Sequence, residues 1–338
     1  MSLYLMCILG SLLVTSSSVA GQSFSYDGQR GPLHWGEEYN TCVGKHQSPI
    51  NIEEHIVVNV SLPSLKFSGL DVSRSAYLTN NGHTVMLRLN DPETAQVSGG
   101  PLGQDPYVFE QLHFHWGEND SEGSEDKINN HSFAMELHVV FYKKSYGSMG
   151  AAVHNPDGLA VLAYFFEASE DDNPTYESIV KSLPSIENLD SNVKLPEDLI
   201  IDPILVPNYS LMQNYFTYNG SLTTPPCSEV VTWIDFKDPL PLSHAQIAAF
   251  RDVRTSEGSK LTHNFRPVQP LEDRVVYHNI VNDDKDANLS KNKTVESNTI
   301  AEAHSGQFQL DGSVVSTVAA FLLTFRSTLF PMMLEDIR

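Results

Sequence analysis

The sequence predicts a mostly β domain of the α+β class, and three observations support this prediction. Short apolar segments recur between Phe24 and Val281, for example VMLRL, FAMELHVVFY and VVTWIDF. Clusters of glycine, asparagine, aspartate and proline separate these segments, which is typical of strands joined by turns. The sequence contains neither an internal repeat nor a heptad pattern, so we expect no solenoid and no coiled coil.

Two segments carry signals for the start of a helix. Asn173 and Pro174 precede TYESIVKSL, and proline is favoured in the first turn of a helix. Ser243 precedes HAQIAAFRDV and is a suitable N-cap. We therefore expect a few short helices beside the strands.

The composition indicates one large soluble domain with appendages. Of the 338 residues, 41% are hydrophobic and 19% are charged, which is enough apolar material for a sizeable core. The net charge is −21, and this opposes binding to the phosphate backbone of nucleic acids. We therefore expect no nucleic-acid partner.

The ends of the chain differ from the central domain of residues 21–281. Residues 1–20 hold an apolar run followed by Ser18-Val19-Ala20, which predicts a secretory signal peptide cleaved before Gly21. Because this segment has no basic residue, a short buried helix is the alternative. Residues 282–312 are rich in Asp, Asn, Lys, Ser and Thr and predict a polar stalk.

Residues 313–338 predict a membrane attachment of one of two kinds. The apolar run from Val314 to Phe330 contains Arg326 and is shorter than the roughly 20 residues of an ordinary transmembrane helix. Small residues behind the stalk, at Ser305-Gly306 or Gly312-Ser313, match the signal for a glycosylphosphatidylinositol anchor. The charged end LEDIR suits a single-pass helix with a short cytoplasmic tail instead. We favour the lipid anchor; a buried core helix is a third alternative.

Two short stretches, QLHFHWG and ELHVVFY, supply three histidines at strand spacing. Residues two apart in a strand share a face, so His113 and His115 direct their imidazoles to one point. His138, in the second stretch, supplies a third ligand from a neighbouring strand. Three neutral imidazoles leave one tetrahedral position of Zn²⁺ open, which is typical of catalytic zinc sites. The alternative is three ordinary half-buried histidines.

Two polar residues accompany the histidines. Gln111 and Glu136 each precede a histidine by two residues, so each shares its face and is expected to fix the tautomer of the ring. A cupin-type metal site also uses a His-x-His pair. Its carboxylate ligand typically follows at a wider spacing than Glu118 has after His115.

Three cysteines occur in the sequence, and Cys7 lies in the predicted signal peptide. Removal of that segment leaves Cys42 and Cys227. Two cysteines in an oxidising compartment most simply form one disulfide. A pair of free buried thiols is the alternative.

The chain closely resembles the alpha class of carbonic anhydrases from Phe24 to Val281. The resemblance implies a central, twisted, mainly antiparallel sheet of about ten strands with short peripheral helices, and a zinc ion in a conical cleft. Seven motifs besides the two histidine stretches carry it, in the same order: SYDGQRGPLHW, KHQSPINI, NNGH, GSE, PDGLAVLAYFF, NGSLTTPPCSEVVTW and HNFRPVQPL.

The resemblance implies an activity, the reversible hydration of carbon dioxide to bicarbonate and a proton, by attack of a zinc-bound hydroxide. Zinc in a three-imidazole site lowers the pKa of bound water to about 7. A catalytically silent binding or adhesion module of the same family is the alternative. The signal peptide and either form of attachment place the domain at the extracellular face of the plasma membrane.

The resemblance also implies a role for each matching residue. His83 is the proton shuttle, and Tyr26 and Asn81 order the connecting waters. Thr223, paired with an ionised Glu125, orients the hydroxide. Asn264 supports the site from behind. The residues expected to bind substrate are Val140, Val161, Leu222, Thr223, Thr224 and Trp233. Four positions depart from the common family pattern: Met86, Asp126, Met149 and Phe265.

Seven Asn-x-Ser/Thr sequons agree with passage through the secretory pathway. We expect the sequon at Asn219 to be unmodified, because it directly precedes the stretch that the resemblance places in the active site. The sequons expected to carry glycans are those at Asn59, Asn119, Asn130, Asn208, Asn288 and Asn292.

Overall fold

The computed structural model describes residues 24–255 and 257–280. The predicted signal peptide, stalk and membrane attachment, with Asn288 and Asn292, lie outside the described residues. Among the residues that are described, no helix is both long and apolar enough to cross a membrane. The chain divides into two compact units, residues 1–281 and 282–338, and the first contains all the structure discussed below.

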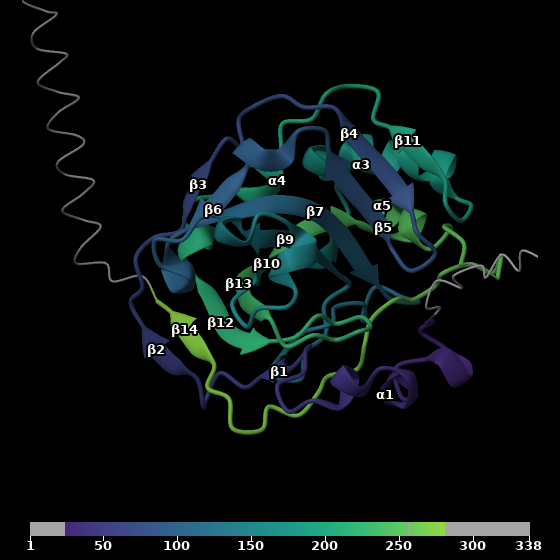
Figure 1. Ribbon diagram of the computed structural model, residues 1–338. Coiled ribbons are helices and arrows are strands. Elements are labelled where there is room, and N and C mark those ends of the chain that lie inside the picture. Colours follow the sequence, from purple (N-terminus) through teal and green to yellow (C-terminus); the bar gives the residue numbers. More distant parts are fainter. Residues whose placement is uncertain (1–23, 256, 281–338) are drawn as a thin grey trace, which may run out of the picture. The chain divides into compact units, whose positions relative to one another are not determined.

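A twisted sheet of twelve strands runs through this unit (Figure 1). Its main path has the order β11-β4-β5-β7-β9-β10-β13-β12-β14-β2, and β6 joins it beside β7 with β3 at its outer side. Most neighbours are antiparallel, but β10 pairs with β13 and β14 with β2 in parallel. A separate parallel pair consists of β1 and β8. The predicted fold class is confirmed, and the sheet is mixed and mainly antiparallel, with twelve strands where about ten were expected.

The strands match the apolar segments of the sequence. VMLRL forms β5, and the two histidine stretches lie in β7 and β9. The strand bounds are β1 Asn51–Ile52, β2 Val58–Val60, β3 Lys66–Ser68, β4 Ala76–Asn80, β5 Val85–Leu89, β6 Gln96–Ser98, β7 Tyr107–Trp116, β8 Lys127–Ile128, β9 Met135–Lys143, β10 Leu159–Ser169, β11 Asn192–Lys194, β12 Tyr215–Gly220, β13 Val231–Ser243 and β14 Tyr277–Asn279.

The α-helices are short and peripheral, as predicted. Asn173 caps a 3₁₀ turn, Pro174–Tyr176, that leads into α3. Ser243 Oγ accepts a hydrogen bond from Gln246 N, and Gln246 Oε1 accepts one from Ser243 N, which is a capping box at the start of α5. The α-helix bounds are α1 Trp35–Glu38, α2 Met149–Ala152, α3 Glu177–Ser182, α4 Asp202–Leu205 and α5 His244–Phe250.

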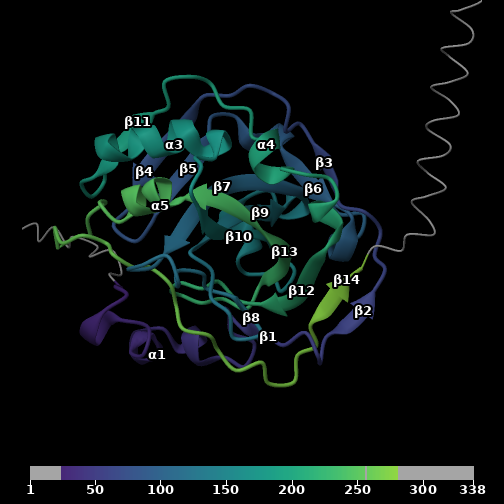
Figure 2. The same ribbon diagram turned by 180° about the vertical axis from the view of Figure 1, so that it is seen from behind.

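Two buried clusters lie on opposite faces of the central strands. One contains Phe114, Phe250 and Ile179, and so joins the sheet to α3 and α5, which gather near β4 and β5 in both views (Figures 1 and 2). The other contains Val161 and Trp233. Because successive strand residues face opposite sides, β7 and β9 contribute large apolar side chains to the first cluster and their histidines to the second face.

Candidate metal centre

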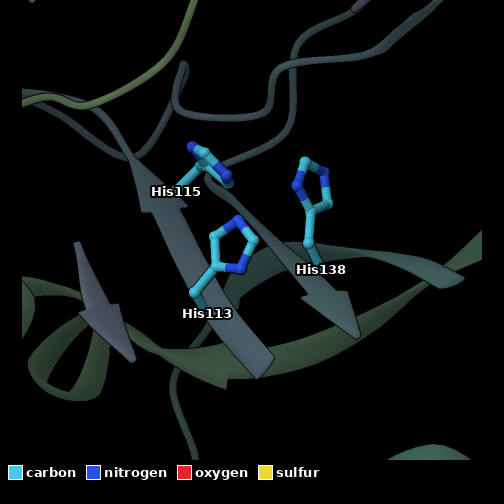
Figure 3. A group of neighbouring side chains, drawn as sticks. All are labelled: His113, His115 and His138. Atoms are coloured by element: carbon cyan, nitrogen blue, oxygen red, sulfur yellow. The ribbon is translucent and has the colours of Figure 1, made fainter. Parts of the chain in front are cut away.

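The register of the sheet assembles the three histidines. Strands β7 and β9 are antiparallel neighbours, and His113 lies directly opposite His138, while His115 lies opposite Glu136. Directly opposed residues have Cβ atoms about 4.5–5.5 Å apart. The prediction that the second histidine stretch forms a strand beside the first is therefore confirmed, and all three rings converge on one point (Figure 3).

Each ring has one nitrogen engaged by the protein, which leaves the other for a metal. Nδ1 of His113 is 2.9 Å from Gln111 Oε1, and Nδ1 of His115 is 2.7 Å from the backbone oxygen of Asn264. Nε2 of His138 is 2.6 Å from Glu136 Oε1. The remaining nitrogens, Nε2 of His113, Nε2 of His115 and Nδ1 of His138, are the ligand atoms that this pattern assigns.

This set fits a zinc ion. The ligand atoms lie within 4.8 Å of one another, and three imidazoles leave a fourth tetrahedral position open. Burial, followed by the neighbouring rings, lowers the pKa of His113 and His138 well below the ordinary value. The rings of His113 and His138 are therefore neutral, which is the form that binds metals. Nε2 of His115 is buried and makes no hydrogen bond within the described residues.

Glu136 is held in place from its far side. Its Oε2 accepts hydrogen bonds from the backbone N–H groups of Glu125 (2.7 Å) and Asp126 (3.0 Å). Burial and three neighbouring carboxylates raise the pKa of Glu136 well above its ordinary value. A short bond to His138 then fixes the ring's orientation, as a carboxylate behind a metal ligand commonly does.

Asn264 connects the ligand strand to the loop that carries His83. Its Nδ2 donates to the backbone oxygens of His83 (3.0 Å) and Phe114 (2.8 Å), and its Oδ1 accepts from Trp116 N (2.7 Å). Together with the bond from His115, these contacts use both the side chain and the backbone of this residue. Asn264 is fully buried, so the connection is rigid.

Glu125 lies behind the metal centre. Its Oε1 accepts from the backbone N–H of Arg266 (2.8 Å), while its Oε2 makes no hydrogen bond of good geometry within the described residues. Burial raises the pKa of Glu125, whereas His115, the Thr223 side chain and Arg266 act to lower it. Nε2 of His115 lies 3.4 Å from Glu125 Oε2, and the pairing of the Thr223 hydroxyl with this carboxyl stays a prediction.

A hollow of about 250 Å³ opens in front of the three histidines. It contains nearly all of the residues predicted to face the substrate; Glu125, Glu136 and Asn264 support it from behind. The predicted residues that line it, besides the histidines of the metal centre, are Tyr26, Asn81, His83, Gln111, Val140, Val161, Leu222, Thr223, Thr224 and Trp233. Met86 and Met149, two of the departures from the family pattern, line it as well.

One wall of this hollow is a single row of residues across the sheet. Val140 on β9 is registered with Val161 on β10, and Val161 with Trp233 on β13. All three are at most 2% exposed. Trp233 also contacts the ring of His138, with centroids 4.8 Å apart. The wall beside the metal centre is therefore apolar and fixed by strand register.

The lining of the hollow also includes His83, in the turn between β4 and β5. Asn81 shapes this turn, because its Oδ1 accepts from the N–H groups of His83 (3.0 Å) and Thr84 (2.9 Å). The ring of Phe24 stacks on His83 with centroids 3.9 Å apart. Burial, and then the charge of Arg30, lower the pKa of His83.

Sequence reasoning missed Phe24 and Thr84, which also line the hollow. Phe24 comes from the first described residues, far from the loop of His83 in the sequence. An aromatic residue two positions before Tyr26 was the available signal, but its contact with His83 depends on tertiary packing. Thr84 follows His83 directly and donates to the backbone oxygen of Phe114 at 2.6 Å.

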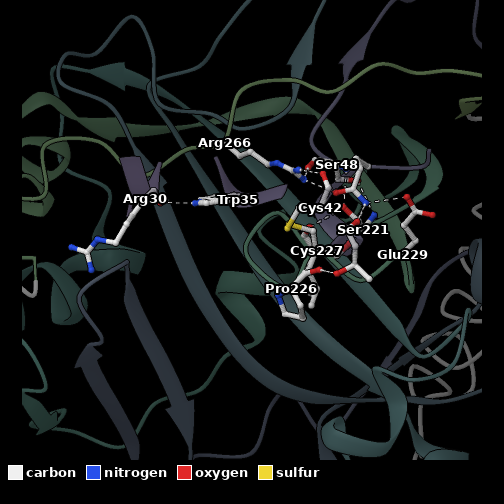
Figure 4. The surroundings of a disulfide bond; sticks show 12 residues. Arg30, Trp35, Cys42, Ser48, Ser221, Pro226, Cys227, Glu229 and Arg266 are labelled. Atoms are coloured by element: carbon white, nitrogen blue, oxygen red, sulfur yellow. Dashed lines mark hydrogen bonds between the residues drawn. A yellow bond between two sulfur atoms is a disulfide. The ribbon is translucent and has the colours of Figure 1, made fainter. Parts of the chain in front are cut away.

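The predicted disulfide between Cys42 and Cys227 is present (Figure 4). Beside it, the guanidinium of Arg266 donates to the backbone oxygens of Cys42 and Ser48 and to Gln47 Oε1. The backbone N–H of the same arginine binds Glu125. Arg266 therefore connects the backbone at the disulfide with Glu125 behind the metal centre.

A buried acidic group continues the row of the ligands. His138 is registered with Ala163 and Ala163 with Asp235 on β13. Asp235 is fully buried, and neither carboxylate oxygen forms a hydrogen bond within the described residues. Asp126, a departure from the family pattern, accepts from Ile50 N and Tyr218 Oη. Nothing in the sequence indicated that these two acids would lie near enough to interact.

The sequons that the structure describes all have exposed asparagines. Asn59 lies in the edge strand β2, and Asn119, Asn130 and Asn208 lie in turns or loops. Asn219 is exposed as well, although it was expected to lie beside the cleft; it does not line the hollow of the metal centre.

The comparisons with known proteins agree with this geometry. The profile of the family described as eukaryotic-type carbonic anhydrase matches residues 30–280. Carbonic anhydrase 7 of Homo sapiens is 39% identical over 260 residues, which are 75% of this chain and 96% of that protein. Carbonic anhydrase 15 of Mus musculus is 36% identical over 260 residues (74% and 80%), and carbonic anhydrase 6 of Homo sapiens 36% over 262 residues (76% and 82%).

Proposed function

This chain belongs to the eukaryotic-type, alpha-class carbonic anhydrase family, and we propose that it catalyses the reversible hydration of carbon dioxide outside the cell. The observation that carries the proposal is that each of the three histidines uses one ring nitrogen for a contact with the protein, while the other three nitrogens converge beside the hollow. His115 and His138 are buried, and all three histidines line the hollow.

Zinc is the metal that we assign to this centre, held by Nε2 of His113, Nε2 of His115 and Nδ1 of His138. When bound there, it would lower the pKa of a water molecule to about 7 and so supply a nucleophile at neutral pH. Gln111, Glu136 and the backbone oxygen of Asn264 orient the rings from behind. Such partners also increase the affinity of a site for its metal.

The apolar wall is the proposed binding surface for carbon dioxide. The substrate is small, uncharged and apolar, and it needs no hydrogen-bonding group to hold it. Val140, Val161 and Trp233 exclude water from the side of the hollow that they line. Leu222 completes this wall from the loop after β12.

Thr223 is proposed to orient the reacting water. A hydroxyl has one hydrogen to donate. If Thr223 donates it to Oε2 of an ionised Glu125, its lone pairs face the hollow and accept only a hydrogen bond. Thr223 lines the hollow and its side chain acts to lower the pKa of Glu125, and both support this assignment. Thr224 beside it is proposed to contact substrate or ordered water.

His83 is proposed to carry the product proton to solvent. It lines both the hollow and the outer surface near Gly28 and Glu257, so its ring connects the two. Its lowered pKa keeps the ring neutral at pH 7 and able to accept a proton. Tyr26 and Asn81 line the hollow on the same side and are proposed to order the intervening waters.

Stopped-flow hydration of carbon dioxide, measured with the zinc content of the same preparation, tests the function. We expect one zinc per chain and rapid hydration in the native protein, and loss of both in His138→Ala. His154→Ala is the matched control, because His154 is exposed and has no part in the centre. Full zinc retention in His138→Ala would contradict the ligand assignment, whereas native zinc without hydration would indicate a silent binding module.

We propose an extracellular location with a membrane attachment. The boundaries are a signal peptide at 1–20, a catalytic domain at 21–281, a stalk at 282–312 and an attachment segment at 313–338. The disulfide supports an oxidising compartment. Glycans are proposed at Asn59, Asn119, Asn130, Asn208, Asn288 and Asn292.

Treatment of intact cells with phosphatidylinositol-specific phospholipase C tests the form of attachment. Release of active enzyme supports the lipid anchor. Complete retention, with Arg338 still present in the mature protein, supports a single-pass helix instead.

A further inference from the structure

A second hollow, of about 290 Å³, lies away from the metal centre at the β12 and β14 end of the sheet. Its lining is mostly apolar and includes Val60, Leu62, Pro101, Val275 and Tyr277. Val275 and Tyr277 are 46% and 42% exposed. Large apolar side chains with that much exposure leave a surface that a ligand or a covalent group would cover.

Asn219 lies in the wall of this hollow. On β12 it follows Tyr218, whose ring stacks on Trp233 of the metal-centre wall at an interplanar angle of 9°. Because neighbouring strand residues face opposite sides, the Asn219 side chain faces away from the metal centre. The earlier expectation that Asn219 is unmodified depended on its nearness to the cleft in the sequence, and this geometry removes that reason.

The side-chain amide of Asn219 is available. Its Oδ1 has one long contact, 3.5 Å from Thr232 Oγ1. Its Nδ2, the atom to which an N-linked glycan attaches, takes part in no hydrogen bond within the described residues, and the residue is exposed.

The structure explains why glycine and serine occupy the second and third positions of the sequon, Gly220 and Ser221. A Cβ at Gly220 would lie 2.1 Å from Ser48 Oγ, so only glycine fits there. Ser221 Oγ accepts from Ser48 N at 2.9 Å. Packing therefore explains Gly220 and Ser221 without a glycan. It does not explain Asn219, whose side chain is exposed and makes only the one long hydrogen bond.

The strand register brings Asn219 close to the ring of Tyr277. Thr217 is paired with Tyr277 in the antiparallel β12–β14 ladder, so Tyr277 is the diagonal neighbour of Asn219 on the same face. Diagonal neighbours are about 7–8 Å apart, a distance that one sugar ring spans. Tyr277 presents an aromatic face, against which the C–H groups of a pyranose pack favourably.

We propose that Asn219 carries an N-linked glycan whose first N-acetylglucosamine lies in this hollow against Tyr277 and Val275. The inference rests on entry of the chain into the secretory pathway, as proposed above, but not on catalysis. The glycan covers the exposed apolar surface at the β14 end of the sheet and leaves the metal centre on the other face open.

Peptide mass spectrometry of the protein expressed in cultured animal cells tests whether the glycan is attached. Enzymatic deglycosylation in ¹⁸O-water converts each glycosylated asparagine to a labelled aspartate, and we expect this label at Asn219. Asn208 is the matched control, since it is an exposed sequon without such a hollow. An unlabelled Asn219 beside a labelled Asn208 overturns the proposal. If no sequon is labelled, the secretory location and this proposal both fail, while the hydration assay remains independent of either.

A double-mutant cycle tests the position of the sugar. Asn219→Gln should lower the midpoint of thermal unfolding by about 2 °C or more, with Asn208→Gln as the control without effect. Tyr277→Ala should lower the midpoint in the glycosylated protein and change it much less in the Asn219→Gln background. Hydration rates should be unchanged throughout. Equal effects of Tyr277→Ala in both backgrounds would mean that the glycan extends into solvent, and this would overturn the proposed position of the first sugar in the hollow.

Discussion

The two sides of the hollow in front of the metal centre are built in different ways. The apolar side is a row of strand residues, Val140, Val161 and Trp233, paired across β9, β10 and β13. The polar side combines His83, from a turn, with Phe24, from the start of the described chain. Strand register fixes the first, whereas only side-chain contacts between distant segments fix the second.

This difference indicates how each side tolerates change. A residue in the registered row has no room to move, because neighbouring strands constrain it on both sides. A turn residue such as His83 changes its orientation at a lower cost. A dry binding surface needs a constant shape, while a group that transfers protons between the hollow and solvent benefits from freedom to turn.

The largest effect should come from filling the apolar side. Val161→Tyr places a phenol in the hollow, and we expect a loss in kcat/KM of more than about 10²-fold, since even a small displacement of substrate has that effect. Zinc content and the unfolding midpoint of the same preparation separate blocked binding from misfolding. Val161→Ile is the matched control. Near-native kcat/KM in a zinc-loaded Val161→Tyr protein would show that substrate binds elsewhere.

The next effect concerns Thr223, which also lines the hollow. Thr223→Ala should reduce hydration by about 10²-fold, the scale of one positioned hydrogen bond in a transition state. Zinc should remain bound, because Thr223 is not a ligand. Thr223→Ser keeps the hydroxyl and should recover most of the rate. If both variants are equally slow, the methyl group and not the hydroxyl is responsible.

A smaller effect is expected on the polar side. His83→Ala should slow turnover roughly tenfold at low buffer concentration, below the usual range for a proton-transfer group because solvent partly substitutes for it. Added imidazole should restore the rate. The exchange of carbon dioxide with bicarbonate at equilibrium should change little, since it needs no proton export. Native turnover of the variant in weak buffer would assign the proton to another route.

The pH dependence of this proton transfer follows from the surroundings of His83. Burial and Arg30 lower its pKa from 6.5, and only the neutral ring accepts a proton. Turnover in weak buffer should therefore fall as the pH falls through a value below 6.5. Phe24→Ala uncovers the ring and should move this inflection to higher pH. An inflection that stays in place would show that the stack does not bury His83.

The smallest effect on activity should come from Asp235, which lies in the row of the ligands but outside the hollow. Burial, and then Asp126, raise its pKa well above the ordinary value. The folded protein therefore binds the Asp235 proton more tightly than the unfolded chain does. The stability that this proton contributes is present at acidic pH and is lost as the pH rises through the folded-state pKa.

Asp235→Asn removes this titration. Above the folded-state pKa of Asp235 it should raise the free energy of unfolding by about 1–3 kcal/mol, the range for a buried unsatisfied polar group, with little change at acidic pH. Hydration should stay within about twofold of native, a change of under half a kcal/mol in the barrier. Urea unfolding over a series of pH values measures the difference, and a gain that is the same at every pH would contradict the role of ionisation.

Much of the site follows from local sequence. The period of two in a strand places Gln111, His113 and His115 on one face, and Glu136 and His138 on another strand's face, whatever the remaining chain does. The N-caps at Asn173 and Ser243 are local for the same reason, since their hydrogen bonds span only a few residues. The cysteine count predicted the disulfide, because only Cys42 and Cys227 remain after removal of the predicted signal peptide.

The tertiary structure alone decided how these pieces meet. The pairing of His113 with His138, the bond from His115 to the backbone of Asn264 and the stack of Phe24 on His83 join segments far apart in the sequence. Such a long-range contact determines which nitrogen of His115 is free, whereas Gln111 and Glu136, each two residues away, do so for His113 and His138. The neighbouring strands also turned Asn219 away from the cleft and buried Asp235 beyond Ala163. The alternation of a strand assigns a side chain to a face, but the neighbouring strands decide what that face contacts.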